Sequence, residues 1–424
     1  MFRSVRGMKD LYGRESDKFD FILSKFKSVG ERYGFGMIYT PILEYTDVFL
    51  RSIGDETDVV SKEMYTFLDK GEESVTLRPE GTAGVIRAVV CEHMDQCLPV
   101  KLMYCGEMFR YDRPQKGRFR QFRQFGLEYI GDKSPHTDAI TIAIAADCIR
   151  SIGFFDFKIS LNSLGDDETR ENYTKAIVKY FSRHEDRLSD ESKSRLRKNP
   201  LRILDSKDKQ DIEICSMAPI LMDYLSKESR TYFNRVCSLL GDYEINYEID
   251  NFLVRGLDYY SHTAFEIHPT AGSYREALGG GGRYDKLLSI FGGQEASGIG
   301  FAIGIERLMF LMDEFFTQQK KRKVAVVPVS EAETSTAFAI FRDLQNCQIA
   351  SEFIHLGNLG KKMKIADRLG CDIAIIIGEN EIQSKTVTLK FMNNREAENK
   401  NKTVRGADLI QFLRTTLDNQ PACT

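Results

Sequence analysis

The most chemically suggestive stretch of the chain runs from Gly106 to Gly131 and reads GEMFRYDRPQKGRFRQFRQFGLEYIG. Between Arg110 and Arg123 it contains six cationic side chains but a single carboxylate, although the whole chain has a net charge of only -3. Aromatic residues are interleaved with the arginines. Positive charge combined with aromatic rings suits a ligand with phosphates and flat bases, either a nucleotide or a nucleic acid.

Alternation along this stretch predicts a strand with two unlike faces. The polar face carries Arg118, Arg120, Phe122, Gln124 and Glu128. A sheet does not bury such a face without a ligand, because buried polar groups need partners. The opposite face is typical of packing and carries Phe119, Gln121, Arg123, Phe125, Leu127 and Tyr129. Taken alone, the segment is equally consistent with a solvated basic hairpin.

Two arginines from distant parts of the chain favour a bound anion. Arg255 lies in a predicted tight turn, and Arg307 follows the small-residue strand GIGFAIG. Arginine in such apolar surroundings needs an anionic partner, because an unpaired buried charge is costly. Together with Arg110 and Arg118 they predict a polyanion such as a triphosphate. Separate structural ion pairs are the alternative.

Composition limits the class of protein. A chain of 424 residues is long enough for two or three domains, and no apolar run approaches the roughly 20 residues of a membrane span. The first residues lack the apolar core of a secretory signal. Nine cysteines are scattered without paired spacing, which favours reduced thiols in the cytoplasm over disulfides or zinc.

Two common nucleotide-binding motifs fail on inspection. The chain has no GxxxxGK[ST] phosphate loop, and the glycines of GIGFAIG are one residue away from the dinucleotide-binding spacing. A polyanion site would therefore rest on arginine side chains and not on a glycine-rich loop.

The surrounding pattern predicts an α+β fold. We expect an amphipathic helix over 15–33, a strand interrupted by Pro41 at an edge or interface, and a helix over 137–151. Residues 166–235 are densely charged and predict a helical insertion within a first domain spanning 1–323. Residues 324–424 alternate as βαβαβ and predict a separate α/β domain with a partly parallel sheet.

At this point the motifs resemble those of a known family. In order along the chain they are RGMKDLYG, TLRPEGTAGVIRA, FRYDRPQKGRFRQFRQFGLE, RGLDYYSHTAFE, GGGGRYD and GFAIGIERL. The chain resembles class II histidyl-tRNA synthetases over nearly its whole length. The resemblance implies a class II antiparallel-sheet catalytic domain over 1–323 and a class IIa anticodon-binding domain over 324–424. It also implies ATP-dependent attachment of L-histidine to histidine tRNA through a histidyl-adenylate.

The resemblance implies a histidine pocket. Glu80, Thr82 and Gln124 would meet the α-amino group, and the imidazole would lie between Glu128 and Tyr260. A neutral imidazole offers one donor and one acceptor, so an acidic group paired with a hydroxyl suits it. The implied set is Glu80, Gly81, Thr82, Arg110, Gln124, Glu128, Arg255, Tyr259, Tyr260 and Tyr284.

The resemblance also implies an ATP site and a catalytic group. Arg110 would bind the α-phosphate, with Arg255 opposite it where other enzymes use a metal. Arg118 and Arg307 would take the outer phosphates, and adenine would stack on Phe122. Magnesium would arrive with ATP, and its ligands are not assigned. Transfer to tRNA has no evident side-chain base, so the implied catalytic residues are Arg110, Gln124 and Arg255.

Contacts with RNA and with a second copy are implied as well. Gln115 and Arg120 match loop positions that read the extra 5′ guanosine of histidine tRNA. The basic helix bearing Lys361, Lys362, Lys364 and Arg368 favours a solvated face over a code reader. A cytoplasmic homodimer joined partly through the Pro41 segment is expected.

His262 departs from the pattern, because the family usually has a small residue there, often glycine. We expect its side chain to face solvent. A non-catalytic histidine-sensing paralogue, such as the regulatory subunit of ATP phosphoribosyltransferase, is the alternative function. Such paralogues typically lose the C-terminal domain and the phosphate-binding arginines, and this chain has both.

Overall fold

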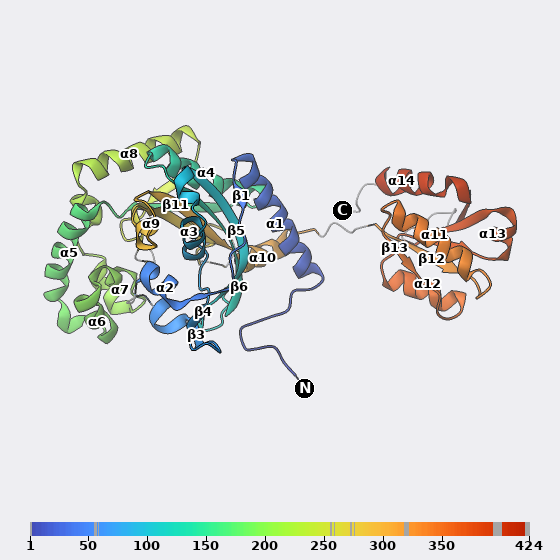
Figure 1. Ribbon diagram of the computed structural model, residues 1–424, viewed down its shortest axis with the longest axis horizontal. Coiled ribbons are helices and arrows are strands. Elements are labelled where there is room, and N and C mark those ends of the chain that lie inside the picture. The colour runs from blue at the N-terminus through green and yellow to red at the C-terminus, as the bar shows by residue number, and fades with distance from the viewer. Residues whose placement is uncertain are drawn as a thin grey trace. The chain divides into compact units, whose positions relative to one another are not determined.

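The computed structural model describes residues 2–54, 57, 59–254, 257, 259–271, 274, 276–317, 322–392 and 401–419. The chain divides into two compact units, Met1–Phe316 and Thr317–Thr424, here called the first and second units (Figure 1). Within the described residues, no helix combines the length and apolar character needed to cross a membrane.

The first unit is built on an eight-stranded sheet, in the order β1-β5-β6-β11-β10-β9-β7-β8. The two edge pairs, β1 with β5 and β7 with β8, are parallel, and the pairings between them are antiparallel. This confirms the predicted antiparallel sheet of the first domain. The strands are β1 (Gly36–Met37), β5 (Val100–Phe109), β6 (Gln121–Ile130), β7 (Phe157–Ser163), β8 (Tyr247–Ile249), β9 (Ser261–Pro269), β10 (Gly279–Tyr284) and β11 (Gly298–Gly304).

Helices bury one face of this sheet. The main ones are α1 (Arg14–Arg32), α4 (Pro135–Ser151), α8 (Lys227–Asp242) and α10 (Ile305–Leu311). The helices expected over 15–33 and 137–151 are present with ends shifted by at most two residues. The start of α4 is fixed by Ser134, whose side chain accepts from the His136 amide, and by Pro135 in the first turn.

Strand β6 begins at Gln121, so Arg118 and Arg120 of the predicted polar face precede it, and the two predicted faces hold from Gln121 onward. Phe125 and Leu127 are fully buried in the core formed with the helices, and Phe26 of α1 packs edge-on against Phe125. Phe122 belongs to a different cluster, on the other side of the sheet. The polar face of β6 is therefore directed away from the helical layer, and the functional side chains gather there.

Pro41 separates two strands that belong to different sheets. β1 ends at Met37, and β2 (Leu43–Tyr45) joins a three-stranded sheet in the order β2-β4-β3. The missing proline N–H suits this change of sheet. The neighbouring elements are α2 (Thr46–Ile53), β3 (Tyr65–Leu68), β4 (Ser74–Leu77) and α3 (Thr82–Cys91).

The charged segment after β7 is helical, as predicted. It contains α5 (Asp167–Ser182), α6 (Asp190–Lys198) and α7 (Lys209–Cys215), with the short α9 (Leu287–Ile290) later in the chain. Side chains of Asp166, Ser189 and Asp208 cap the three helices, which explains why so polar a segment folds locally. α8 continues past the expected end at 235 and packs against α4 (Figure 1).

The second unit is an α/β domain with a five-stranded sheet in the order β13-β12-β14-β15-β16. β13, β12 and β14 are parallel, and β15 and β16 are antiparallel, as the predicted partly parallel sheet requires. Its elements are β12 (Val324–Pro328), α11 (Thr334–Asn346), β13 (Ser351–Phe353), α12 (Leu359–Arg368), β14 (Ile373–Ile377), α13 (Glu379–Ser384), β15 (Thr386–Phe391), β16 (Asn401–Arg405) and α14 (Leu409–Asn419).

The basic helix of this unit, α12, requires one correction. Lys362 is buried and donates to the carbonyl oxygen of Pro328 at 2.8 Å, so it does not belong to a solvated face. The helix period turns this position toward β12, while Lys361 and Lys364 are not buried.

Candidate active site

Glu128 is the centre of a buried polar cluster on the open face of β6. Its two carboxylate oxygens accept hydrogen bonds from Thr82 Oγ1 at 2.7 Å and from the Tyr284 hydroxyl at 2.6 Å. Burial raises the pKa of Glu128 to about 8; the two hydroxyl donors oppose the shift and the charge of Glu80 adds to it. A carboxyl group with this pKa carries a proton over much of the neutral range when no ligand is bound.

The strand next to β6 leaves room for this carboxylate because it carries glycine. Gly300 of β11 is paired with Glu128, and a Cβ built at Gly300 would lie 1.9 Å from Glu128 Oε2. A side chain at position 300 would therefore displace the carboxylate. The small residues of GIGFAIG serve close packing beside the site and not a dinucleotide turn.

Glu80 lies at the beginning of α3. Its carboxylate accepts hydrogen bonds from the amides of Thr82 and Ala83, both at 2.7 Å. Burial raises the pKa of Glu80, and these two amides together with the charge of Arg110 oppose that shift. Amide donors and the helix N-terminus both favour negative charge at this point. Glu80 therefore adds a second carboxyl group to the same pocket.

Aromatic side chains surround the two carboxyl groups. The rings of Tyr259 and Tyr260 are 4.6 Å apart, and Tyr259 meets Tyr284 edge-on at 5.9 Å. All three are buried. Burial raises the pKa of Tyr259 and of Tyr284 well above the ordinary value, so both keep their protons. These residues form a buried cluster in which aromatic rings surround a few hydroxyl and carboxyl groups.

Tyr104 on β5 also belongs to this cluster, although no motif in the sequence marks it. A Cβ built at Gly81 would lie 2.2 Å from its ring, and one built at Gly126 would lie 2.1 Å from it. The ring is therefore held between two glycines, next to Thr82. A tyrosine in a strand looks like ordinary core, and only glycine at both contacting positions could have indicated the close approach.

Two of the expected phosphate-binding arginines lie near the pocket. The Arg110 guanidinium stands over the Phe122 ring at 5.5 Å, and its Nε donates to the Pro79 carbonyl at 2.9 Å. Burial lowers the pKa of Arg110, the carboxylates of Glu63 and Glu80 oppose the shift, and the charge of Arg307 adds to it. The charge of Arg307 thus reaches Arg110, as expected of two arginines placed to bind one anion.

Arg118 and Gln124 both have a buried polar atom without a partner. Arg118 forms ion pairs with Glu276 at 2.6 Å and Asp112 at 3.4 Å, while its Nε has no hydrogen-bond partner among the described residues. The same holds for Gln124 Oε1 within the described part of the chain. Both atoms are available for a ligand on the polar face of β6.

The two expected RNA-reading residues lie on the loop before β6. Gln115 is exposed and forms an isolated bridge with Arg118. Arg120 instead packs: its guanidinium lies 3.8 Å from the centre of the Tyr111 ring, and its amide donates to Gly7 at 2.8 Å. Gln115 is thus the more accessible of the two.

Arg255, the expected catalytic arginine, lies outside the described residues, as does its neighbour Gly256. Of the other expected residues, the structure brings together Glu80, Gly81, Thr82, Glu128, Tyr259, Tyr260 and Tyr284. Within the described residues, no group of three or more His, Cys, Asp and Glu is arranged to hold a metal ion.

The expectation for His262 is wrong, because its side chain does not simply face solvent. Its ring packs 5.2 Å from that of Tyr232 on α8, and Nε2 lies 3.7 Å from the Asp285 carboxylate. The backbone φ of His262 is 46°, in the left-handed region that glycine adopts most easily. This explains why a glycine suits the position.

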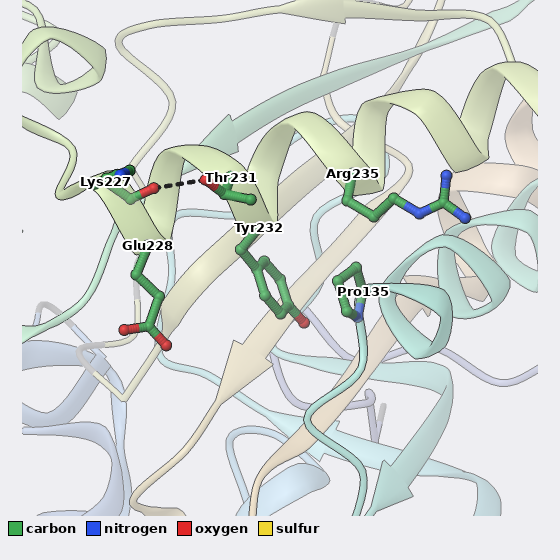
Figure 2. Close-up of a pocket in the computed structure, with 6 residues that line it drawn as sticks. All are labelled: Pro135, Lys227, Glu228, Thr231, Tyr232 and Arg235. Atoms are coloured by element: carbon green, nitrogen blue, oxygen red, sulfur yellow. Dashed lines mark hydrogen bonds between the residues drawn. The ribbon is translucent and has the colours of Figure 1, made fainter.

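A groove of about 580 Å³ lies outside this pocket, along α8 and the start of α4 (Figure 2). Figure 2 shows the ring of Tyr232 facing Pro135, with the remaining side chains spread along α8. None of the expected site residues lines it. Its lining residues are Pro135, Lys227, Glu228, Thr231, Tyr232 and Arg235.

Comparison with known proteins gives matches to both units of the chain. A family model described as histidyl-tRNA synthetase matches residues 7–308, and one described as anticodon binding domain matches residues 323–416. A protein of Rhodospirillum rubrum named histidine–tRNA ligase is 44% identical over 410 residues, covering 96% of this chain and 98% of its own. A protein of the same name from Staphylococcus carnosus is 40% identical, covering 99% of both chains.

The same family is found among solved structures. The crystal structure of apo S. aureus histidyl-tRNA synthetase superposes with a TM-score of 0.82 at 34% sequence identity. The match covers 97% of this chain and 99% of that one, so both units are included.

Proposed function

The chain belongs to the histidyl-tRNA synthetase family, and from this premise we propose how its residues perform the reaction. It is an aminoacyl-tRNA ligase that attaches L-histidine to histidine tRNA at the expense of ATP, through a histidyl-adenylate. The observation that best supports the residue assignments is the buried Glu128 with its two hydroxyl donors, Thr82 and Tyr284.

Histidine binds with its imidazole ring against Glu128. Each carboxylate oxygen has a second lone pair, so Glu128 can accept the imidazole N–H while keeping its present donors. Tyr260 supplies the hydroxyl for the other ring nitrogen, and Tyr259 lines the pocket. The α-amino group meets Glu80, Thr82 and Gln124. The buried carboxyl of Glu80 supports this part of the assignment because an ammonium group is its natural counter-charge.

ATP binds beside the histidine carboxylate. Adenine stacks on Phe122, Arg110 holds the α-phosphate opposite Arg255, and Arg118 and Arg307 take the outer phosphates. The effect of the Arg307 charge on Arg110 and the unsatisfied Nε of Arg118 support this set. Magnesium carried by ATP would neutralise phosphate charge. Catalysis follows from alignment of the reactants and from arginine charge at the α-phosphorus.

The second step transfers histidine to the 3′ end of the tRNA. Gln124 lies beside the adenylate and orients the attacking hydroxyl, and the adenylate's own phosphate oxygen takes the proton. Gln115 and Arg120 contact the extra 5′ guanosine. The exposure of Gln115 supports this role. The second unit recognises the anticodon arm, as its match to an anticodon-binding family suggests.

The enzyme acts as a homodimer in the cytoplasm. Exposed apolar side chains around Pro41 support a self-association surface, because monomers rarely expose so many in one region. They are Tyr39, Ile42, Leu43, Tyr45, Phe67 and Leu68. Leu43→Glu is expected to yield a monomer in analytical ultracentrifugation, and an unchanged dimer would exclude this surface.

ATP–pyrophosphate exchange across a panel of amino acids tests the whole assignment. Exchange is expected with histidine alone, and dependence on another amino acid would overturn the pocket. Histidine binding without exchange would instead indicate a non-catalytic sensor. Arg255→Ala is expected to lower exchange by roughly 10²-fold or more with folding intact. Near-normal exchange would remove Arg255 from the catalytic step.

A further inference from the structure

Arg118 forms an ion pair with a carboxylate that has no role in the proposed reaction. Its Nη2 lies 2.6 Å from Glu276 Oε2, with side-chain exposures of 24% and 47%. The Asp112 contact is longer, at 3.4 Å. Glu276 is 158 residues away along the chain, and it lies just before β10. This pair therefore joins the loop before β6 to a distant segment.

The residue after Glu276 engages the second arginine assigned to the outer phosphates. Arg307 Nη1 donates a hydrogen bond to the carbonyl oxygen of Ala277. The same short segment packs on the loop, since a Cβ built at Gly117 would lie 2.9 Å from the Tyr274 hydroxyl. Two consecutive residues, 276 and 277, thus offer anionic or partly negative oxygens to the two arginines.

A triphosphate would need the same donors. Guanidinium groups bind carboxylate and phosphate oxygens through the same N–H fork, so the two anions compete for it. Burial by itself would lower the pKa of Arg118, and the net shift is upward because Glu276 and Asp112 stabilise its charge. Glu276 therefore adds negative charge at the position where an incoming phosphate would bind.

We propose that Glu276 is a placeholder carboxylate, a positioning residue that occupies the phosphate-binding edge of Arg118 and is displaced by the outer phosphates of ATP. The inference rests on the proposed role of Arg118. The proposal predicts that Glu276 weakens the binding of nucleotides that have outer phosphates and leaves the binding of AMP unchanged. A purely structural role would affect both nucleotides equally.

Glu276→Gln keeps the size of the side chain and removes its charge. Its Kd for ATP, measured by calorimetry with magnesium and without histidine, is expected to fall about 2- to 5-fold, which is the range of a half-exposed ion pair. The Kd for AMP should stay the same. Glu295→Gln is the matched control, because Glu295 is an exposed glutamate of the same unit that forms no ion pair in the described structure. An ATP affinity that is unchanged or weaker in Glu276→Gln would overturn the proposal.

Arg118→Met separates this proposal from the proposed function. It is expected to weaken the binding of ATP at least tenfold without affecting the binding of AMP. Adding Glu276→Gln to this variant should then have no further effect on the Kd for ATP. Unchanged ATP affinity in Arg118→Met would refute the phosphate role of Arg118. A loss in Arg118→Met combined with no effect of Glu276→Gln in the otherwise native chain would refute the placeholder alone. Circular dichroism of each variant verifies that it is folded.

Discussion

Glu128 is placed to bind the ligand, but its burial lowers the stability of the folded protein without ligand at higher pH. Its folded pKa of about 8 lies above the ordinary 4.5, so the folded state holds an extra proton between these values. Stability attributable to this group therefore falls as pH rises from about 5 to 8. Glu128→Gln should not show this loss. Between pH 5 and pH 8, its free energy of unfolding should therefore fall less than the free energy of unfolding of the native chain, by about 1 kcal/mol or more.

Urea unfolding of both proteins at the two pH values measures this effect. The same substitution should reduce histidine-dependent exchange by roughly 10²-fold or more, since a neutral amide replaces the charged acceptor for the imidazole. Gain of stability at pH 8 together with loss of activity is the expected pattern. Equal pH dependence in the two proteins would show that Glu128 is already ionised in the empty pocket.

The backbone of His262 permits a second test at the level of a single residue. Both substitutions His262→Ala and His262→Gly remove the ring that packs on Tyr232, but only alanine keeps the strain of φ 46°. The glycine variant should be the more stable of the two by about 1 kcal/mol. Thermal unfolding compares them directly, and an alanine variant that is as stable as the glycine variant would show that this conformation is not strained.

Strand pairing sets the shape of the pocket at the level of elements. The Glu128 carboxylate lies close over the β11 backbone because Gly300, its partner in the ladder, has no side chain. Gly300→Ala should push the carboxylate away from Thr82 and Tyr284 and raise the KM for histidine roughly tenfold or more. Gly241→Ala on α8 is the control, since a Cβ there meets nothing within 4 Å. If both variants kept the native KM, the close approach would not matter for binding.

Local patterns predicted elements better than they predicted contacts. The alternation of β6 identified its packing face, because a strand has only two sides, and helical spacing located α1 and α4. The role of Tyr104 depends on glycines from α3's N-terminus and β6 meeting its ring, a fact of tertiary packing. The contact of His262 with Tyr232 likewise joins β9 to α8, two elements that no local pattern connects.

For the candidate site, too, the residues that take part could be predicted better than the contacts between them. The family resemblance implies that Glu80, Thr82, Glu128 and Tyr284 line one histidine site, and the structure links Thr82 and Tyr284 to Glu128 and Glu80 to the Thr82 amide by hydrogen bonds. Their hydrogen-bond directions could not be predicted, since they depend on distances of a few ångströms between strands. The ion pair between Arg118 and Glu276 could not be predicted from the sequence either, because a glutamate just before a glycine-rich strand has no distinguishing pattern.

The whole molecule consists of two units with separate cores. The clusters around Phe125 and Tyr284 contain only residues of the first unit, and those around Val326 and Ala325 contain only residues of the second. Cores that share no side chain allow each unit to fold by itself. Every described residue assigned to histidine or ATP belongs to the first unit.

This division predicts that the two chemical steps can be separated. A chain ending at residue 316 should keep histidine-dependent ATP–pyrophosphate exchange within about tenfold of the full chain, since it retains the complete adenylate site. Charging of histidine tRNA should fall by roughly 10²-fold or more, because binding by two linked units gains affinity from their effective concentration. The full chain with Lys361→Ala and Lys364→Ala tests the contribution of the second unit to charging without removing it, since both lysines lie on α12 and face away from the core. A shortened chain that is folded but inactive in exchange would show that the second unit contributes to the adenylate site. A shortened chain that charges tRNA normally would show that the second unit has no part in tRNA binding.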